Sequence, residues 1–179
     1  SQAPDIHRMV ATLSQRAGIP KPKVYIIEDN SPNAFATGRN PEKGVVALST
    51  GLIKLMNRDE LEGVIAHELS HIKHRDTLIS TVAATIAGAI MVLASIMRFT
   101  AIFGIGSSSD DDGENVLVLL VMAIVAPIAA MIIQMAISRS REYKADRGAA
   151  TLTRNPYGLA SSLEKLGYYT DRIRMKSNT

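Results

Sequence analysis

The sequence contains no cysteine and no tryptophan, and it has only three phenylalanines and five tyrosines in 179 residues. The lack of cysteine excludes a disulfide framework and any thiolate metal site. The formal net charge of +3 is too small to indicate a nucleic-acid-binding protein, and no basic stripe is interleaved with aromatic residues. We therefore expect no nucleic acid among its partners.

Two long segments of the chain carry no charge. Residues 78–97 and 116–137 are rich in Ala, Ile, Val, Leu and Met. Since about twenty apolar residues span the hydrocarbon core of a bilayer, we predict two transmembrane helices. Pro127 is expected to kink the second helix. The alternative is a pair of buried helices in a soluble protein.

The charges around these segments predict their orientation in a membrane. Basic residues stand at the outer ends: Lys73, His74, Arg75, Arg139, Arg141, Lys144 and Arg147. The connection, residues 98–115, holds Asp110, Asp111, Asp112 and Glu114, with Arg98 as its only basic residue. By the positive-inside rule, the outer ends face the cytoplasm. We expect a multi-pass protein of the inner or plasma membrane, with the lipid bilayer as a partner.

A short motif, His67-Glu68-Leu69-Ser70-His71, has the form H-E-x-x-H. Apolar residues recur at helical spacing around it, and Asn57 with Glu60 resembles a capping box at the start of that helix. On a helix, His67 and His71 share one face and can bind one zinc ion, and Glu68 can reach a metal-bound water. The alternative is a helix that carries two histidines by accident.

A catalytic zinc needs a third protein ligand. Glu142 and Asp146 form an E-x-x-x-D pair on a second helical segment. Glu142 could complete a His-His-Glu set, and Asp146 could accept a hydrogen bond from the distal nitrogen of a ligating histidine. Such a pair alone is more often a solvated helix face.

These motifs, together with Ser138 to Asp146 and the upstream Asn33-Ala34-Phe35-Ala36-Thr37-Gly38, resemble the HtpX family of membrane heat-shock zinc proteases, distant relatives of the CAAX prenyl proteases. The resemblance implies an integral-membrane zinc endopeptidase that degrades damaged or misassembled membrane proteins. It assigns the zinc to His67, His71 and Glu142 and the general base to Glu68. Family members usually carry two further membrane segments before this region and continue past it, so we expect the sequence to be part of a longer protein.

The expected fold is α+β, a mainly helical zincin-like domain with a small antiparallel sheet and a transmembrane helical hairpin. We predict helices over 4–17, 51–56 and from Pro156 to a stop at Gly167, and strands over 24–28, 33–37 and 44–48. Leu159, Leu163 and Leu166 are expected to face inward. Residues 1–77 and 138–179 would form the two parts of the catalytic domain, and residues 78–137 the hairpin. The oligomeric state is not indicated.

The strand Asn33-Ala34-Phe35-Ala36 is a candidate for binding substrate, because an exposed sheet edge can hold any peptide through its main-chain groups. A purely structural strand is the alternative. Unfolded or membrane proteins would be the substrates. Glu68 would take a proton from the attacking water and deliver it to the leaving amine. Arg139, Tyr143 and His74 are candidates, by position only, for stabilising the oxyanion.

The spacing also predicts where the zinc lies relative to the membrane. If both helices continue straight, the rise of about 1.5 Å per residue places His71 roughly 10 Å, and Glu142 roughly 8 Å, above the hydrocarbon boundary. We expect the site just above the cytoplasmic membrane surface. Two alternatives remain from the sequence: a scaffold with a structural metal and no catalysis, and a soluble zinc hydrolase of a non-peptide substrate.

Overall fold

The structure, a computed structural model, describes residues 3–103 and 112–177 and divides into two compact units. The first unit comprises the residues up to Leu78 and those from Arg141 onward, and the second is Ile79–Ser140. The first unit contains every strand of the described chain and the H-E-x-x-H motif. The second consists of the apolar parts of two long helices.

The first unit contains a three-stranded sheet of mixed direction. Strands β1 (Lys23–Ile27), β2 (Ala34–Thr37) and β3 (Val45–Ser49) have the order β1-β3-β2. β3 is antiparallel to β2 but parallel to β1. The mainly helical α+β class is confirmed, whereas an entirely antiparallel sheet is wrong. Since β3 lies between the other two strands, β1 and β2 are not paired although they are consecutive in sequence.

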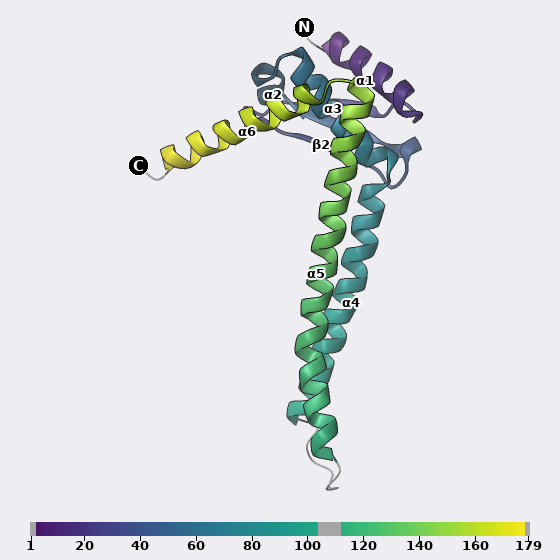
Figure 1. Cartoon of the computed structure of the whole chain (residues 1–179), viewed down its shortest axis with the longest axis vertical. Coiled ribbons are helices and arrows are strands. Elements are labelled where there is room, and N and C mark those ends of the chain that lie inside the picture. The colour runs from purple at the N-terminus through teal and green to yellow at the C-terminus, as the bar shows by residue number, and fades with distance from the viewer. Residues whose placement is uncertain (1–2, 104–111, 178–179) are drawn as a thin grey trace. The chain divides into compact units, whose positions relative to one another are not determined.

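Helix α3 (Arg58–Lys73) is central to the first unit. It contacts α1 (Ala3–Ala17), α6 (Pro156–Ser177) and the sheet, as Figure 1 shows. The predicted capping box is confirmed: the Glu60 N–H donates to Asn57 Oδ1 at 2.9 Å, and the Asn57 N–H donates to Glu60 Oε2 at 2.8 Å. Because α3 is fixed at its start and packed on three sides, it provides a rigid base for the side chains of its last two turns.

Glu60 also joins α3 to α6. Its buried carboxylate accepts hydrogen bonds from Lys165 Nζ and Ser161 Oγ, each at 2.7 Å. Burial alone would raise the pKa of Glu60, but the bonds from Lys165, Ser161 and the Asn57 N–H outweigh it and lower the pKa overall. The negative charge of Glu60 therefore helps to fix α6 against the helix of the H-E-x-x-H motif.

Helix α6 differs from its prediction at its end. It begins at Pro156 as expected but continues through Gly167 to Ser177. A side chain at Gly167 would meet no atom within 4 Å, so glycine there is tolerated at an open helix position. Leu159 is buried, whereas Leu163 is 54% exposed, so the inward placement of Leu163 is wrong. Helix α2 (Thr50–Leu55) follows the N-cap Ser49.

The second unit is a helical hairpin formed by the apolar parts of α4 (Asp76–Phe103) and α5 (Asp112–Thr153), which run side by side in Figure 1. Gln134 Nε2 donates to the Ala83 carbonyl across the pair at 3.4 Å. Both helices are long and apolar enough to cross a membrane, and only 11% of the most apolar window of each is buried. Helix α5 continues through Pro127.

The connection between the two helices is shorter than the predicted range of 98–115, since residues 98–103 and 112–115 are helical. The rest of it, including Asp110 and Asp111, lies outside the described residues.

Helix α3 does not continue straight into the first apolar helix. It ends at Lys73, and α4 begins at Asp76 after a two-residue connection in which Arg75 has a φ of 55°. The assumption of one straight helix from His71 to Leu78 is therefore wrong. On the other side, α5 is unbroken from Ile137 to Glu142, as assumed.

Candidate active site

The two histidines of the motif face each other on α3. His67 Nε2 and His71 Nε2 are 3.0 Å apart, and the rings meet edge to face at an interplanar angle of 82°. Both side chains are largely buried, with 17% and 19% of their surface exposed. Helical spacing alone brings the rings to one face, and their remaining contacts fix the direction in which each ring points.

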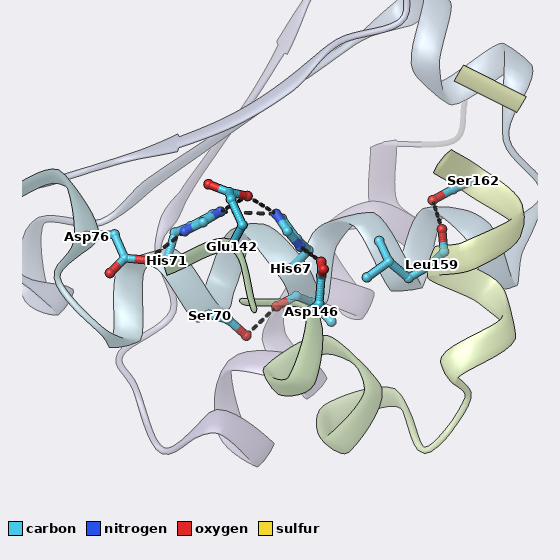
Figure 2. Close-up of polar contacts among 9 residues, drawn as sticks. His67, Ser70, His71, Asp76, Glu142, Asp146, Leu159 and Ser162 are labelled. Atoms are coloured by element: carbon cyan, nitrogen blue, oxygen red, sulfur yellow. Dashed lines mark hydrogen bonds and ion pairs between the residues drawn. The ribbon is translucent and has the colours of Figure 1, made fainter. Parts of the chain in front are cut away.

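Each imidazole has a carboxylate behind it, as Figure 2 shows. Asp76 Oδ2 lies 2.7 Å from His71 Nδ1, and Asp146 Oδ1 lies 3.0 Å from His67 Nδ1, although off the line of that N–H bond. Because a carboxylate accepts, the hydrogen bond with Asp76 indicates that Nδ1 is the protonated nitrogen of His71. His71 Nε2 then presents its lone pair towards His67 Nε2 at 3.0 Å, and a cation between the two nitrogens could bind both.

Glu142, on α5, completes the cluster. Its Oε2 lies 3.5 Å from His67 Nε2 and 3.8 Å from His71 Nε2. The three ligand atoms therefore form a triangle that could hold one metal ion. Bonds of about 2.0–2.1 Å in tetrahedral geometry separate ligand atoms by roughly 3.3 Å, close to these values. The nitrogen and oxygen donors are those of a catalytic zinc site, so the residues fit the metal.

Close contact between two helices positions Glu142. Gly148 of α5 lies against Ser70 of α3 so tightly that a Cβ on Gly148 would be 2.3 Å from Ser70 Oγ and 2.9 Å from Ser70 Cβ. Ala145 and Ala149, on either side of Gly148, are fully buried. Small residues on this face of α5 therefore bring its carboxylates within reach of the histidines.

The first residue of α4, Asp76, links the metal-site cluster to two further helices. The buried Asp76 contacts His71, and Arg141 Nη1 donates to the main-chain carbonyl of Asp76 at 2.8 Å. Arg141 immediately precedes Glu142 on α5. The start of α4, the end of α3 and the ligand-bearing turn of α5 are therefore joined by direct polar contacts.

Glu68 lies beside the metal-site cluster and next to β2. Burial raises the pKa of Glu68 above its usual value, while His67 and His71 and a hydrogen bond from the Ala36 N–H oppose that rise. Glu142 adds to it through charge repulsion. A partly desolvated carboxylate of raised pKa, one residue from a metal ligand, has the properties of a general base.

The bond from Ala36 identifies the free edge of β2. Ser49 N–H donates to the Asn33 carbonyl, so this pair is hydrogen-bonded in the antiparallel ladder. By alternation, Phe35 and Thr37 also bond to β3, and the main-chain groups of Ala34 and Ala36 point to the opposite edge. The edge of β2 that pairs with no strand in the described residues therefore faces Glu68.

Comparison with known proteins agrees with this site. The sequence pattern described as "Peptidase family M48" matches residues 1–170. The chain belongs to peptidase family M48. A protein called "Protease HtpX homolog" from Desulforapulum autotrophicum is 56% identical over 174 residues, covering 97% of this chain and 56% of the relative. Proteins of the same name from Pyrococcus furiosus and Nostoc punctiforme are 56% and 51% identical, over 92% and 99% of this chain.

The predicted HtpX-type membership of family M48 is thus confirmed, and with it a His-His-Glu metal site. The chain spans slightly more than half the length of these curated relatives, 56% to 61%.

The structure brings together His67, His71, Glu142, Glu68 and Asp146, all proposed from sequence. Asp76 is an additional contact that sequence reasoning missed. A carboxylate beside a ligating histidine is a common arrangement in metal sites, so an acidic residue near His71 in the sequence could have been considered as its partner.

The three candidates for stabilising the oxyanion lie differently. Tyr143 is 75% exposed, and His74 caps the end of α3. His74 lines a hollow with Ser70 and Gly148 in which His67, His71 and Glu68 take no part. Arg139 belongs to the helical-hairpin unit. Their role remains a prediction.

Proposed function

We propose that this chain holds the catalytic centre of a membrane zinc endopeptidase that cleaves unfolded or misassembled proteins in quality control. The observation that carries the proposal is the cluster of His67, His71 and Glu142, with the two Nε2 atoms 3.0 Å apart and Glu68 alongside. Family membership supports the peptidase chemistry, and the proteins of similar sequence are called proteases. A structural metal site would not need a carboxylate in the position of Glu68.

The residues of the chain divide the work of peptide hydrolysis. His67, His71 and Glu142 would hold the zinc ion, and Asp76 and Asp146 would keep the two imidazoles in the ligating tautomer. Bound zinc supplies a Lewis acid that activates water and polarises the scissile carbonyl. Glu68 accepts the proton of the attacking water and transfers it to the leaving amine.

Replacement of the base tests this proposal. Glu68→Gln should abolish cleavage of casein while the bound zinc, measured by atomic absorption, stays at the parent's level. Glu62→Gln is a matched control on the same helix, because Glu62 lies away from the cluster and contacts Arg16 at 3.7 Å. Equal cleavage by Glu68→Gln and the parent would refute the assignment of the base.

The hairpin of α4 and α5 is proposed to span a membrane with the catalytic centre on the cytoplasmic side. Large apolar side chains on it are exposed, among them Val92 at 60%, Phe99 at 65% and Ile133 at 59%, and such a surface needs lipid or protein cover. The basic ends and the acidic connection support the orientation.

The cysteine-free sequence allows a direct test of orientation. In intact cells, an impermeant maleimide should label Ser108→Cys in the acidic connection. It should label Tyr157→Cys, at an exposed position of the first unit, only after the membrane is opened. Labelling of Tyr157→Cys in intact cells would place the catalytic centre on the outer side.

Substrate is proposed to pair with the free edge of β2, over Asn33, Ala34, Phe35 and Ala36. The support is that the main-chain groups of Ala34 and Ala36 point away from β3 and that the Ala36 N–H binds Glu68, so an added strand would run past the base. Since the Ala36 N–H already binds Glu68, a proline there would disturb the base as well as the edge. Peptides N-methylated at single positions avoid this problem. N-methylation at every second residue of the peptide should reduce cleavage, because only alternate main-chain N–H groups of an added strand pair with β2. An equal effect at all positions would contradict edge pairing.

A further inference from the structure

A hollow between α3 and α5 is lined by basic side chains and lies apart from the metal site. This basic hollow has a volume of about 250 Å³. Lys73 and His74 contribute from the end of α3, and Lys144 and Arg147 share one face of α5. No acidic side chain of the described residues lines it, and none of the metal-site cluster does. Its charge therefore favours an anionic ligand.

The chain itself does not neutralise this charge. Within residues 3–103 and 112–177, none of the ion pairs includes one of the four basic residues of the hollow. Asp76, Glu142 and Asp146 are the acidic residues nearest to them in sequence, and these contact the two histidines of the metal-site cluster instead. The basic side chains therefore remain available to a ligand.

The like charges lie on both sides of a close helix contact. Ser70 of α3 and Gly148 of α5 also line the hollow, and they pack so closely that a Cβ on Gly148 would clash with Ser70. Figure 2 shows the Ser70 hydroxyl directed away from the two imidazoles. Since Lys73 on one helix repels Lys144 and Arg147 on the other, the empty hollow opposes this contact, and a bound anion would favour it.

The donors and the size of the hollow restrict the anion. The planar guanidinium of Arg147 can bind two oxygens of one phosphate, and lysine ammonium groups add point charges. The hydroxyls of Ser70 and Thr151 already donate to main-chain carbonyls of their own helices, at 2.9 Å and 2.8 Å, so the basic side chains are the donors. Pockets for drug-sized ligands measure roughly 300–1,000 Å³, so this smaller hollow fits a single phosphate group better than a nucleotide.

The basic residues lie close in sequence to both apolar segments. Lys73 precedes residues 78–97 by five positions, and Lys144 follows residues 116–137 by seven. Basic pockets beside the cytoplasmic ends of membrane helices bind the phosphate headgroups of anionic lipids. If the proposed membrane span holds, such a headgroup is one source of the phosphate, and free phosphate in the cytoplasm is the other.

We propose that the basic hollow binds a phosphate-bearing anion that bridges the end of α3 and the face of α5 with Lys144 and Arg147. The bridge lies beside the contact of Ser70 with Gly148, so an occupied hollow holds the ligand-bearing turn of α5 against α3. The anion binds the folded protein and should therefore raise its Tm. This site is separate from the proposed catalytic centre and does not depend on peptidase activity.

Calorimetric titration of the purified, zinc-loaded protein in a non-ionic detergent tests the site at constant ionic strength. The probes are inorganic phosphate and short-chain phosphatidic acid, with phosphatidylcholine of the same chain length as the control for acyl-chain binding. The double variant Lys144→Gln with Arg147→Gln should bind at least one probe about tenfold or more weakly than the parent. Phosphate bound by the zinc itself would persist in this variant, so the difference measures the hollow alone.

A matched double variant controls for the loss of charge. Lys54→Gln with Arg58→Gln removes the same two charges from exposed positions of α2 and α3 outside the hollow, and affinity should stay within about twofold of the parent. Lys73→Gln tests the bridge from the other helix, and it should both weaken binding and reduce the rise in Tm.

The probe that binds identifies the source of the phosphate. Weaker binding of phosphatidic acid alone in the Lys144 and Arg147 double variant would identify a lipid headgroup, of inorganic phosphate alone a free anion, and of both a phosphate group from either source. Equal affinities of the parent and this variant, or an equal loss in the charge control, would overturn the proposal. Unchanged binding by Lys73→Gln would overturn the bridge between the helices.

Discussion

The contact between Gly148 and Ser70 makes a quantitative prediction about the metal site. In Gly148→Ala the new Cβ would lie 2.9 Å from Ser70 Cβ, where ordinary contact needs roughly 3.5–4.0 Å, so α5 must move away from α3 by about half an ångström or more. Overpacking of this kind costs about 1–3 kcal/mol, of which the helix propensity of alanine returns up to about 1 kcal/mol. Because Glu142 lies six residues earlier on α5, the shift also moves its carboxylate away from the histidines.

We expect Gly148→Ala to weaken zinc binding about 10- to 100-fold, the range observed when groups supporting metal ligands are disturbed. Competition with a chromophoric chelator measures the affinity, and chemical denaturation measures the free energy of unfolding. Gly167→Ala is the matched control, since its Cβ meets nothing within 4 Å and should only stabilise α6. The double variant Ser70→Gly with Gly148→Ala removes the clash and should restore binding. Parent-like zinc affinity in Gly148→Ala would refute the reasoning.

Other contacts of the first unit lead to further predictions. Asp76→Asn should lower zinc affinity about 10- to 100-fold, measured by the same competition, because His71 loses its charged acceptor; unchanged affinity would show that Asp76 is dispensable. Lys165→Met should lower the free energy of unfolding by about 1–3 kcal/mol, since the buried Glu60 loses a charged donor. Because the folded pKa of Glu60 is lowered, its stabilisation is complete above the usual glutamate range and is lost as pH falls through the lowered pKa. Denaturation at several pH values should show a weaker acid dependence in Lys165→Met, and identical profiles would contradict this role.

Features set by local sequence could be predicted, whereas those set by distant contacts could not. The capping box of Asn57 and Glu60 and the spacing of His67 and His71 depend on residues within one or two helical turns. The parallel pairing of β1 with β3 depends on which strand occupies the centre of the sheet. The short connections between consecutive strands do not indicate which strand that is. The intrinsic propensity of glycine favours a helix end at Gly167, but α6 continues through this position to Ser177. Packing of α6 elsewhere outweighs that propensity.

Asp76 shows how a wrong local assumption hides a site residue. On a straight helix, a residue five positions after His71 points to a different face, so helical spacing argues against their contact. The chain instead leaves the helix at His74, and Arg75 adopts a left-handed conformation with a φ of 55°. Asp76 then begins a new helix at 2.7 Å from the imidazole of His71. Nothing in the residue types of His74 and Arg75 predicts a break at that point.

The continuous helix α5 also has a consequence for the order in which the centre can be made. Glu142 follows the second apolar segment, so a ribosome completes the H-E-x-x-H motif well before it adds the third ligand. At about 5–20 residues per second, the delay between His71 and Glu142 is roughly 4 to 14 seconds. During that interval the nascent chain carries two of its three ligands and lacks Asp146. The His-His-Glu cluster is therefore completed only after the whole hairpin has left the ribosomal active site.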